Sequence, residues 1–161
     1  IYYSAKNTGR PLGNKEGKFE KFKSNYIDER NEPLFPFGYG LSYTNFSYSN
    51  LMISSSKMTK NETIKVSVEV TNTGNFDGKE VVQLYIRDLV GSVTRPLKEL
   101  KDFKKIALKK GEKQTLTFEI TLDKLKFYNS DLNFVAEPGV FEIFIGTDST
   151  TNNKISFELI N

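Results

Sequence analysis

The 161-residue sequence predicts an all-β fold, an antiparallel β-sandwich of about seven strands with an irregular N-terminal extension. From about Leu51 onward, apolar and polar residues alternate with a period of two, which is typical of strands with one buried face. Turn-forming sequences separate the alternating runs. No window of useful length keeps the 3.6-residue period of a helix. Together these observations favour a sheet protein over a helical one.

The first two predicted strands are ETIKVSVEV and EVVQLYIRD, at residues 62–70 and 80–88. In each run, apolar side chains occupy alternate positions, so one face is expected to be buried. On the second strand, Val81 and Tyr85 make the other face apolar too, which suggests a strand covered on both sides. The side chains expected in the core are Ile64, Val66, Val68, Val70, Val82, Leu84 and Ile86.

Three further strands are predicted toward the C-terminus, KQTLTFEITL, GVFEIFIGTD and KISFELIN, at residues 113–122, 139–148 and 154–161. The turn signals NTGNFDG, KKGEK and EPG fall between the runs of the sandwich. The expected core residues here are Leu116, Phe118, Ile120, Leu122, Phe141, Ile143, Ile145, Ile155, Phe157 and Leu159.

The number and spacing of the strands indicate a more specific architecture. About seven short strands over roughly 110 residues point to an immunoglobulin or fibronectin type III sandwich. An antibody-type domain needs its cysteine pair and a buried tryptophan, and the sequence contains neither residue type. The fibronectin type III-like variant is therefore expected.

Composition excludes several function classes. The net charge of +3 is too small and too evenly spread to indicate a nucleic-acid partner. No run of 18 apolar residues exists, so no membrane span is expected. The absence of histidine and cysteine removes the usual imidazole base and the commonest metal ligands, and Asp77 and Asp88 lack the clustering that calcium needs. Neither a metal nor a cofactor is predicted.

Residues 1–44 are rich in aromatic side chains but lack a strand period. The stretch NEPLFPFGYGLSYTNF contains two prolines and two glycines, which disfavour regular elements, so we expect an ordered, irregular connector. Two interpretations stay open: its rings cover one face of the sandwich, or they pack in a seam against a larger body outside this sequence. We favour the seam. The candidate contacts are Phe35, Phe37, Tyr39 and Tyr43.

The loop RDLVGSVTRPLKEL, residues 87–100, is the second candidate contact, because loops at the ends of sandwiches commonly carry recognition. Arg95 could form a bidentate pair with a carboxylate on a neighbouring domain. The alternative is a solvated arginine in front of the strand-starting Pro96. Both interpretations stay open.

Several motifs occur in a recognisable order: NTGRP, NYIDERNEPLFPFGYGLSYTNFSYSNL, VTNTGNFDGKEVVQLYIRD, VTRPLKELKDFKKIALKKGE and AEPGVFEIFIGTDS. From about Tyr3 to Leu159 the sequence resembles the C-terminal end of glycoside hydrolase family 3 enzymes, bacterial periplasmic β-glucosidases among them. The resemblance implies that residues 1–44 are the tail of an α/β sandwich domain and a linker. Residues 45–161 would form the fibronectin type III-like domain.

The resemblance also implies a function for the longer protein. Such enzymes hydrolyse terminal β-glycosidic bonds by a retaining mechanism with two carboxylates. Neither catalytic motif of the family is present, so no catalytic residue is predicted and the chain should be inactive alone. Asp28, Glu29 and Glu32 cluster in a polar loop, where capping or solvation is the better interpretation.

We therefore expect an accessory, structure-stabilising domain whose partners are the catalytic domains of the same parent chain. Oligosaccharide would be bound only through that parent, and a homodimer is left open. The sequence begins at Ile1 rather than Met, which suggests a mature form or a segment of a longer chain. The resemblance places the parent in the periplasm or outside the cell.

A carbohydrate-binding module is the alternative function. Sugar rings stack on flat, exposed aromatic side chains, among which tryptophan is prominent. This sequence has no tryptophan, and most of its tyrosines lie in the connector rather than on a strand face. The hypothesis stays open as the second choice.

Overall fold

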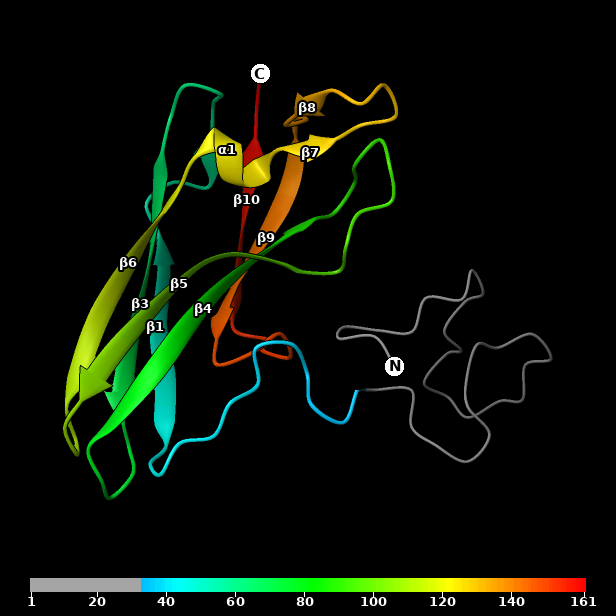
Figure 1. Cartoon of the computed structure of the whole chain (residues 1–161). Helices are drawn as coiled ribbons and strands as arrows, with labels where there is room; N and C mark the ends of the chain where they lie inside the picture. Colours follow the sequence, from blue (N-terminus) through cyan, green and yellow to red (C-terminus); the bar gives the residue numbers. More distant parts are fainter. Residues whose placement is uncertain (1–32) are drawn as a thin grey trace, which may run out of the picture.

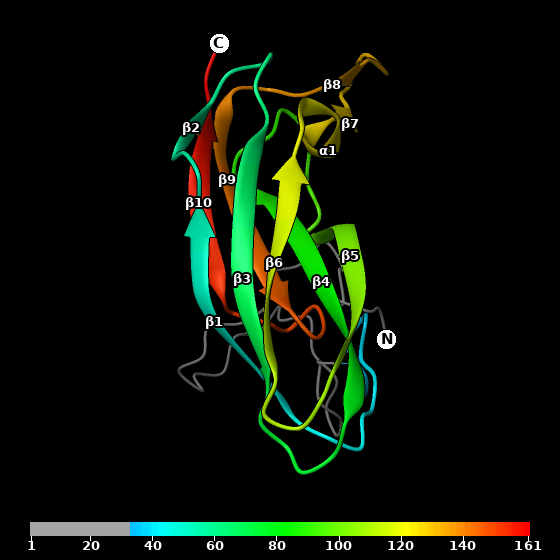
Figure 2. The ribbon, with the colours of Figure 1, turned by 90° about the vertical axis from the view of Figure 1, so that its left-hand side faces the viewer.

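The computed structural model describes residues 33–161, which form two sheets packed face to face (Figures 1 and 2). The first sheet has the strand order β1-β3-β6, and the second has the order β2-β10-β9-β4-β5. The first contains β1 (Phe46–Ile53), β3 (Ile64–Asn72) and β6 (Lys113–Ile120). The second contains β2 (Lys57–Met58), β4 (Gly78–Asp88), β5 (Glu99–Leu108), β9 (Gly139–Gly146) and β10 (Lys154–Leu159).

A short helix and a hairpin connect β6 to β9. They are α1 (Leu122–Leu125) and the two-stranded pair β7 (Phe127–Tyr128) and β8 (Phe134–Val135). No helix among residues 33–161 has the length and hydropathy needed to cross a lipid bilayer. Seven of the ten described strands are at least six residues long, which confirms the predicted sandwich of about seven strands.

Pairing is antiparallel throughout both sheets except between β2 and β10, which run parallel over two residue pairs. In the first sheet, β3 lies between β1 and β6, and its register places Val66 beside Phe118 and Val68 beside Leu116. Neighbouring strands therefore direct their apolar side chains to the same face. Residues 33–45 contain no strand, which agrees with the predicted irregular extension; residues 1–32 lie outside the described part.

The core lies between the sheets and consists of the alternating side chains that the sequence predicted. Leu122 and Ile155 are partly buried against it, and the other predicted core residues are buried. These buried residues include Ile64, Val66, Val68, Val70, Val82, Leu84, Ile86, Leu116, Phe118, Ile120, Phe141, Ile143, Ile145, Phe157 and Leu159.

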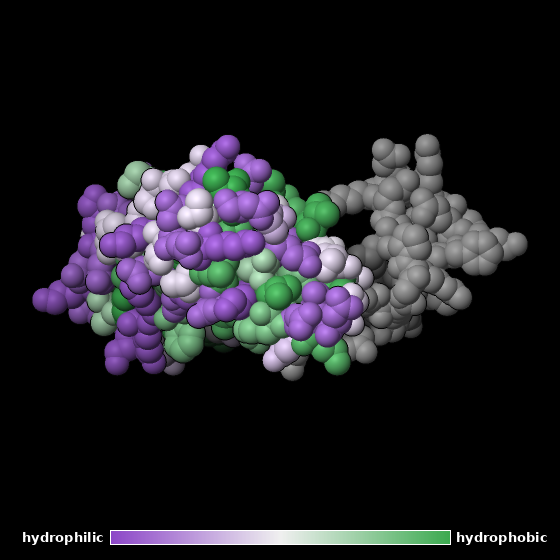
Figure 3. Space-filling view, turned by 90° about the horizontal axis from the view of Figure 1, so that it is seen from above, coloured by the Kyte–Doolittle hydropathy of each residue, from purple (hydrophilic) through white to green (hydrophobic). Residues whose placement is uncertain are grey.

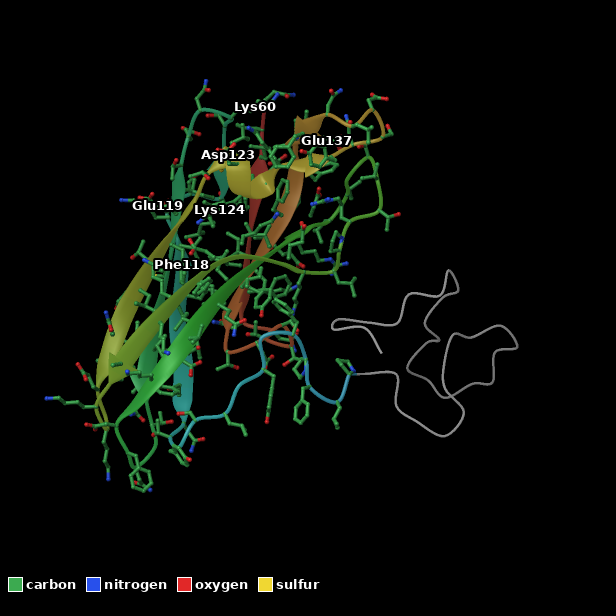
Figure 4. The ribbon with its side chains drawn as sticks, viewed as in Figure 1. Lys60, Phe118, Glu119, Asp123, Lys124 and Glu137 are labelled. Carbon is green, nitrogen blue, oxygen red and sulfur yellow. The ribbon has the colours of Figure 1, made fainter. Side chains whose placement is uncertain are left out.

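Two lysines close the free edge of the first sheet. β6 is the outer strand of that sheet, so half of its backbone carbonyls have no strand partner. Lys104, from β5, donates a hydrogen bond to the carbonyl of Thr117. Lys124, from α1, donates to the carbonyl of Glu119 at 2.6 Å; Figure 4 shows Glu119 and Lys124 at this edge.

Candidate interdomain contact surface

The segment before β1, residues 33–45, is called the arm here, and its C-terminal end is held by Thr44. The Thr44 hydroxyl donates a hydrogen bond of 2.6 Å to Oδ1 of Asn72. The turn after β3 leaves space for this side chain, because a Cβ on Gly74 would come within 2.2 Å of Thr44 Oγ1. A Cβ on Gly78 would come within 2.5 Å of Thr44 Cγ2. Glycine is therefore required at positions 74 and 78, because a side chain at either position would displace Thr44 of the arm.

Asn72 is fully buried, and its amide organises the same corner of the sandwich. Its Nδ2 donates to the carbonyls of Phe76 at 2.8 Å and Leu108 at 3.1 Å, and its Oδ1 also accepts from the Gly74 amide. A buried amide is tolerated when its donors and acceptors have partners. Asn72 therefore fixes the turn, the end of β5 and the arm at once.

A second attachment of the arm lies near its middle, at Gly38. Its φ of +81° lies in the left-handed region that favours glycine. Its carbonyl accepts a hydrogen bond of 2.9 Å from Nε2 of Gln83 on β4. A Cβ at this position would come within 2.1 Å of Gln83 Oε1 and 2.6 Å of the Tyr85 hydroxyl. The neighbouring carbonyl of Phe37 accepts from the Ser149 amide at 2.9 Å.

Tyr85 lies beneath the arm on the outer face of β4. Its ring meets Phe37 edge-on, with ring centroids 6.4 Å apart. Burial, with a contribution from Asp148, raises the pKa of Tyr85 to about 12. The prediction that this strand is covered on both sides is confirmed at Tyr85, whereas Val81 stays partly exposed.

Between the two attachment points, the arm presents apolar side chains to solvent. The exposed fractions are 45% for Tyr39, 89% for Leu41 and 98% for Tyr43. Phe35 is also exposed and lies 5.1 Å from Tyr39, measured between ring centroids. All four predicted contacts are exposed, and Phe37, at 39%, also lies edge-on against Tyr85 of the sandwich. The contact of Phe37 with Tyr85 agrees with rings that cover the sandwich, whereas packing in a seam against a larger body stays a prediction.

A polar cleft separates the arm from the beginning of β4. Its volume is about 550 Å³, and Lys79, Glu80 and Asp148 contribute to its lining. Glu80 itself is buried, and its carboxylate accepts a hydrogen bond of 2.7 Å from the Tyr48 hydroxyl. Burial raises the pKa of Glu80, an effect that the Tyr48 hydrogen bond opposes. The cleft therefore contains a carboxylate without a cationic partner in the described part of the chain.

Arg95 is engaged inside the domain. Only 13% of its side chain is exposed; Nη2 lies 2.7 Å from Glu99 Oε2, and Nε lies 3.8 Å from Asp88 Oδ2. Its guanidinium also lies 4.1 Å from the centre of the Phe127 ring. The alternative of a solvated arginine is thus wrong. The contact of Arg95 with a neighbouring domain stays a prediction, as does that of the exposed Pro96.

The loop that contains Arg95 is connected to the arm. β4 extends to Asp88 and β5 begins at Glu99, so the loop covers residues 89–98. Lys98 donates hydrogen bonds to the carbonyls of Ser149 at 2.9 Å and Thr151 at 2.6 Å, and burial lowers the pKa of Lys98. Because the Ser149 amide also binds the arm, one turn holds both segments.

Sequence reasoning missed three residues that hold the arm and loop 89–98 in place. Asn72 and Gln83 bind the arm, and Lys98 binds the loop to the turn at Ser149. The TNTG motif carries a signal for Asn72, whereas isolated Gln and Lys residues carry none. Among residues 33–161, no three carboxylate, histidine or cysteine side chains are grouped to hold a metal ion. The acidic cluster of Asp28, Glu29 and Glu32 lies outside the described residues.

Known proteins resemble this chain over its whole length. Residues 80–149 match the family model of the fibronectin type III-like domain. The chain is 50% identical over 160 residues to the periplasmic beta-glucosidase of Salmonella typhimurium, covering 99% of this chain and 21% of that protein. It is 48% identical over 131 residues to a beta-xylosidase of Formosa agariphila, covering 81% of this chain and 18% of that protein.

A solved structure shares the same fold. The beta-glucosidase from Listeria innocua in complex with glucose matches with a TM-score of 0.86 and 41% identity, over 100% of this chain and 22% of that chain. The chain thus spans about a fifth of the length of the relatives that it matches. The resemblance seen in the sequence is confirmed: the chain belongs to glycoside hydrolase family 3, as the C-terminal region that carries the fibronectin type III-like domain.

Proposed function

We propose that the chain is the accessory C-terminal part of a β-glucosidase-type glycoside hydrolase, and that it stabilises the enzyme by packing against the catalytic domains. The observation that carries the proposal is the arm, which is held at Gly38 and Thr44 while Tyr39, Leu41 and Tyr43 face solvent. Large apolar side chains on an ordered backbone are typical of a contact surface.

The energetic argument is direct. Burying one Leu- or Phe-sized side chain contributes about 1.5–3 kcal/mol. The two attachment points already order the backbone, so a neighbouring domain would gain this burial at little further loss of conformational entropy. The arm is therefore well suited to orient the sandwich on a second body.

The catalytic domains of the same protein are the proposed partner. The names of the relatives support hydrolysis of terminal β-glycosidic bonds of oligosaccharides by that parent, for which a retaining mechanism uses two carboxylates. Residues 1–44 would be the tail of the preceding domain and the linker, and residues 45–161 the accessory domain itself. A location in the periplasm or outside the cell rests on the name of the Salmonella relative.

Substitution of the exposed arm side chains in the full-length enzyme tests the proposal. The double variant Leu41→Ser/Tyr43→Ser should lower the melting temperature of the full-length protein by several degrees and leave that of the 161-residue chain unchanged. The control Phe103→Ser removes an exposed aromatic side chain from β5 and should change neither. Unchanged melting of the full-length double variant would contradict the proposal.

One observation favours a carbohydrate-binding module as the second candidate. Tyr128 and Phe134 are both exposed, and their ring centroids lie 4.9 Å apart on the β7–β8 hairpin. Titration of the chain with cello-oligosaccharides or laminarin, followed by tyrosine fluorescence, separates the two functions. Saturable binding in the micromolar range would favour the module.

A further inference from the structure

Hydrogen bonds made by Asn129 fix the conformation of the turn between β7 and β8. Asn129 Oδ1 accepts hydrogen bonds from the amides of Asp131 and Asn133, both at 3.0 Å. The carbonyl of Asn129 accepts from the Leu132 amide at 3.1 Å, and its amide donates to the carbonyl of Asn133 at 3.1 Å. These bonds hold the turn in one conformation.

Leu132 lies in the left-handed region at the tip of this turn, with φ of 60°. That region is unfavourable for a bulky L-residue, because its Cβ crowds the following carbonyl. The side chain is also 79% exposed. The other non-glycine residue of positive φ in residues 33–161 is Asn50, a type that tolerates it. Strain together with an exposed apolar side chain points to a function at this position.

Further exposed apolar side chains lie on the same hairpin as Leu132 and on the loop that is bound to it. The exposed ring pair Tyr128 and Phe134 lies on the same hairpin, and the exposed Val90 lies on the adjoining loop 89–98. Ser92 binds this loop to Glu137, which lies in the connection between β8 and β9. The Ser92 amide and hydroxyl both donate hydrogen bonds to the Glu137 carboxylate, at 2.9 and 2.6 Å. Seen from above, the molecule shows apolar patches between hydrophilic residues (Figure 3).

The hairpin, the loop and the arm form one connected frame. Loop 89–98 is bound to the hairpin connection by Ser92 and to the turn at Ser149 by Lys98, and the Ser149 amide binds the arm. All three segments project to the same side of the sandwich in Figure 1, and Glu137 is labelled beside the hairpin in Figure 4. A partner that covers the arm on this side would meet the hairpin on a frame that is already ordered.

We propose that Val90, Tyr128, Leu132 and Phe134, named the hairpin surface here, dock onto the catalytic part of the same protein, beside the contact made by the arm. This inference rests on the proposed function. Under the proposed function, the catalytic part precedes the arm in the chain, and the arm lies on the same side of the sandwich as the β7–β8 hairpin (Figure 1). In the relatives, roughly four fifths of the length lies outside the region matched by this chain. This is enough protein to cover both surfaces.

The substitution Leu132→Asn separates docking from a role within the domain. Docking predicts that the melting temperature rises in the 161-residue chain and falls in the full-length enzyme, whereas a role within the domain predicts a shift in the same direction in both. Asparagine tolerates the left-handed region, so the melting temperature of the 161-residue chain should rise by about 2–4 °C. In the full-length enzyme, the loss of a docked apolar side chain should lower the melting temperature instead. The control Phe76→Asn removes an exposed ring from the opposite end of the sandwich and should show no such reversal.

Three outcomes would overturn the proposal. Melting temperatures that shift in the same direction in the chain and the full-length enzyme would show that Leu132 acts within its own domain, and Leu132→Gly checks that result. Sedimentation showing a dimer that Leu132→Asn dissociates would make a second copy the occupant. Binding of laminarin that is lost in Tyr128→Ala would make a saccharide the occupant. If one of these results is found while the full-length Leu41→Ser/Tyr43→Ser variant melts at a lower temperature, only the docking of the hairpin surface is contradicted. The function proposed for the arm then stands.

Discussion

The hydroxyl of Thr44 and Oδ1 of Asn72, 28 residues apart in sequence, are joined by a buried hydrogen bond of 2.6 Å. This bond connects the end of the arm to the end of β3. The LSYT and NTGNFDG motifs are thus two halves of one structural unit, in which Gly74 and Gly78 provide the space and Asn72 provides the hydrogen bond. The arm enters the sandwich at a defined point.

Thr44→Val should lower the free energy of unfolding of the chain by about 1–2 kcal/mol, because it leaves Asn72 Oδ1 with one partner fewer at nearly unchanged volume. Urea denaturation measures this change. Thr115→Val, on the exposed side of β6, is the matched control and should have a much smaller effect. Equal effects of the two substitutions would mean that the buried bond contributes nothing specific.

Gly38→Ala should release the N-terminal part of the arm, because the new Cβ meets Gln83 in a backbone region that costs a non-glycine residue about 1–3 kcal/mol. The Ser149 amide, which binds the Phe37 carbonyl, should exchange its hydrogen roughly tenfold faster. Gly40→Ala is the control, since nothing lies within 4 Å of its Cβ position. Unchanged exchange in Gly38→Ala would disprove this attachment.

Arg95→Ala should destabilise the 161-residue chain by about 2–4 kcal/mol, because it leaves the buried carboxylate of Asp88 without its cation. Arg95→Lys should recover only part of the loss, since lysine lacks the planar fork that meets Glu99, Asp88 and the Phe127 ring together. Thermal melting of the isolated chain measures both. A melting temperature unaffected by Arg95→Ala would mean that the contacts of Arg95 add no net stability to the domain.

Glu80→Gln should stabilise the chain at neutral pH. Since burial raises the folded-state pKa of Glu80, the protonated form favours folding, and this contribution is lost as the pH rises through the folded-state pKa. The amide keeps an acceptor for the Tyr48 hydroxyl without the buried charge. The advantage of the variant, measured by urea denaturation, should be largest at pH 7 and shrink as the pH falls through the raised folded-state pKa, so that little remains below about pH 4, where Glu80 is protonated in both the folded and the unfolded chain. A constant difference across that range would contradict the assignment.

The central strands could be predicted because their alternation is imposed by burial. In β3, β4 and β6 every second residue enters the core, and that period is visible in the sequence. Strands β1 and β5 were not identified individually. β1 contains an irregularity between Ser49 and Met52 that shifts its register, and β5 is an edge strand rich in lysine with an exposed Phe103.

The contact surface could be predicted only in part. The aromatic arm was visible from its composition, but which ring touches the sandwich, Phe37 against Tyr85, depends on where Gly38 and Thr44 attach. Those attachments join residues far apart in sequence. The role of Leu132 was invisible, because its significance lies in a backbone angle rather than in a residue pattern.

The lysines at the β6 edge have a consequence for handling the protein. Lys104 and Lys124 each occupy a carbonyl that a strand of a second molecule would otherwise use. Reagents that acylate amines convert each ammonium into a neutral amide, which removes the charge and leaves one of its three N–H donors. Such treatment should therefore weaken the protection of the β6 edge and favour its pairing with strands of other molecules.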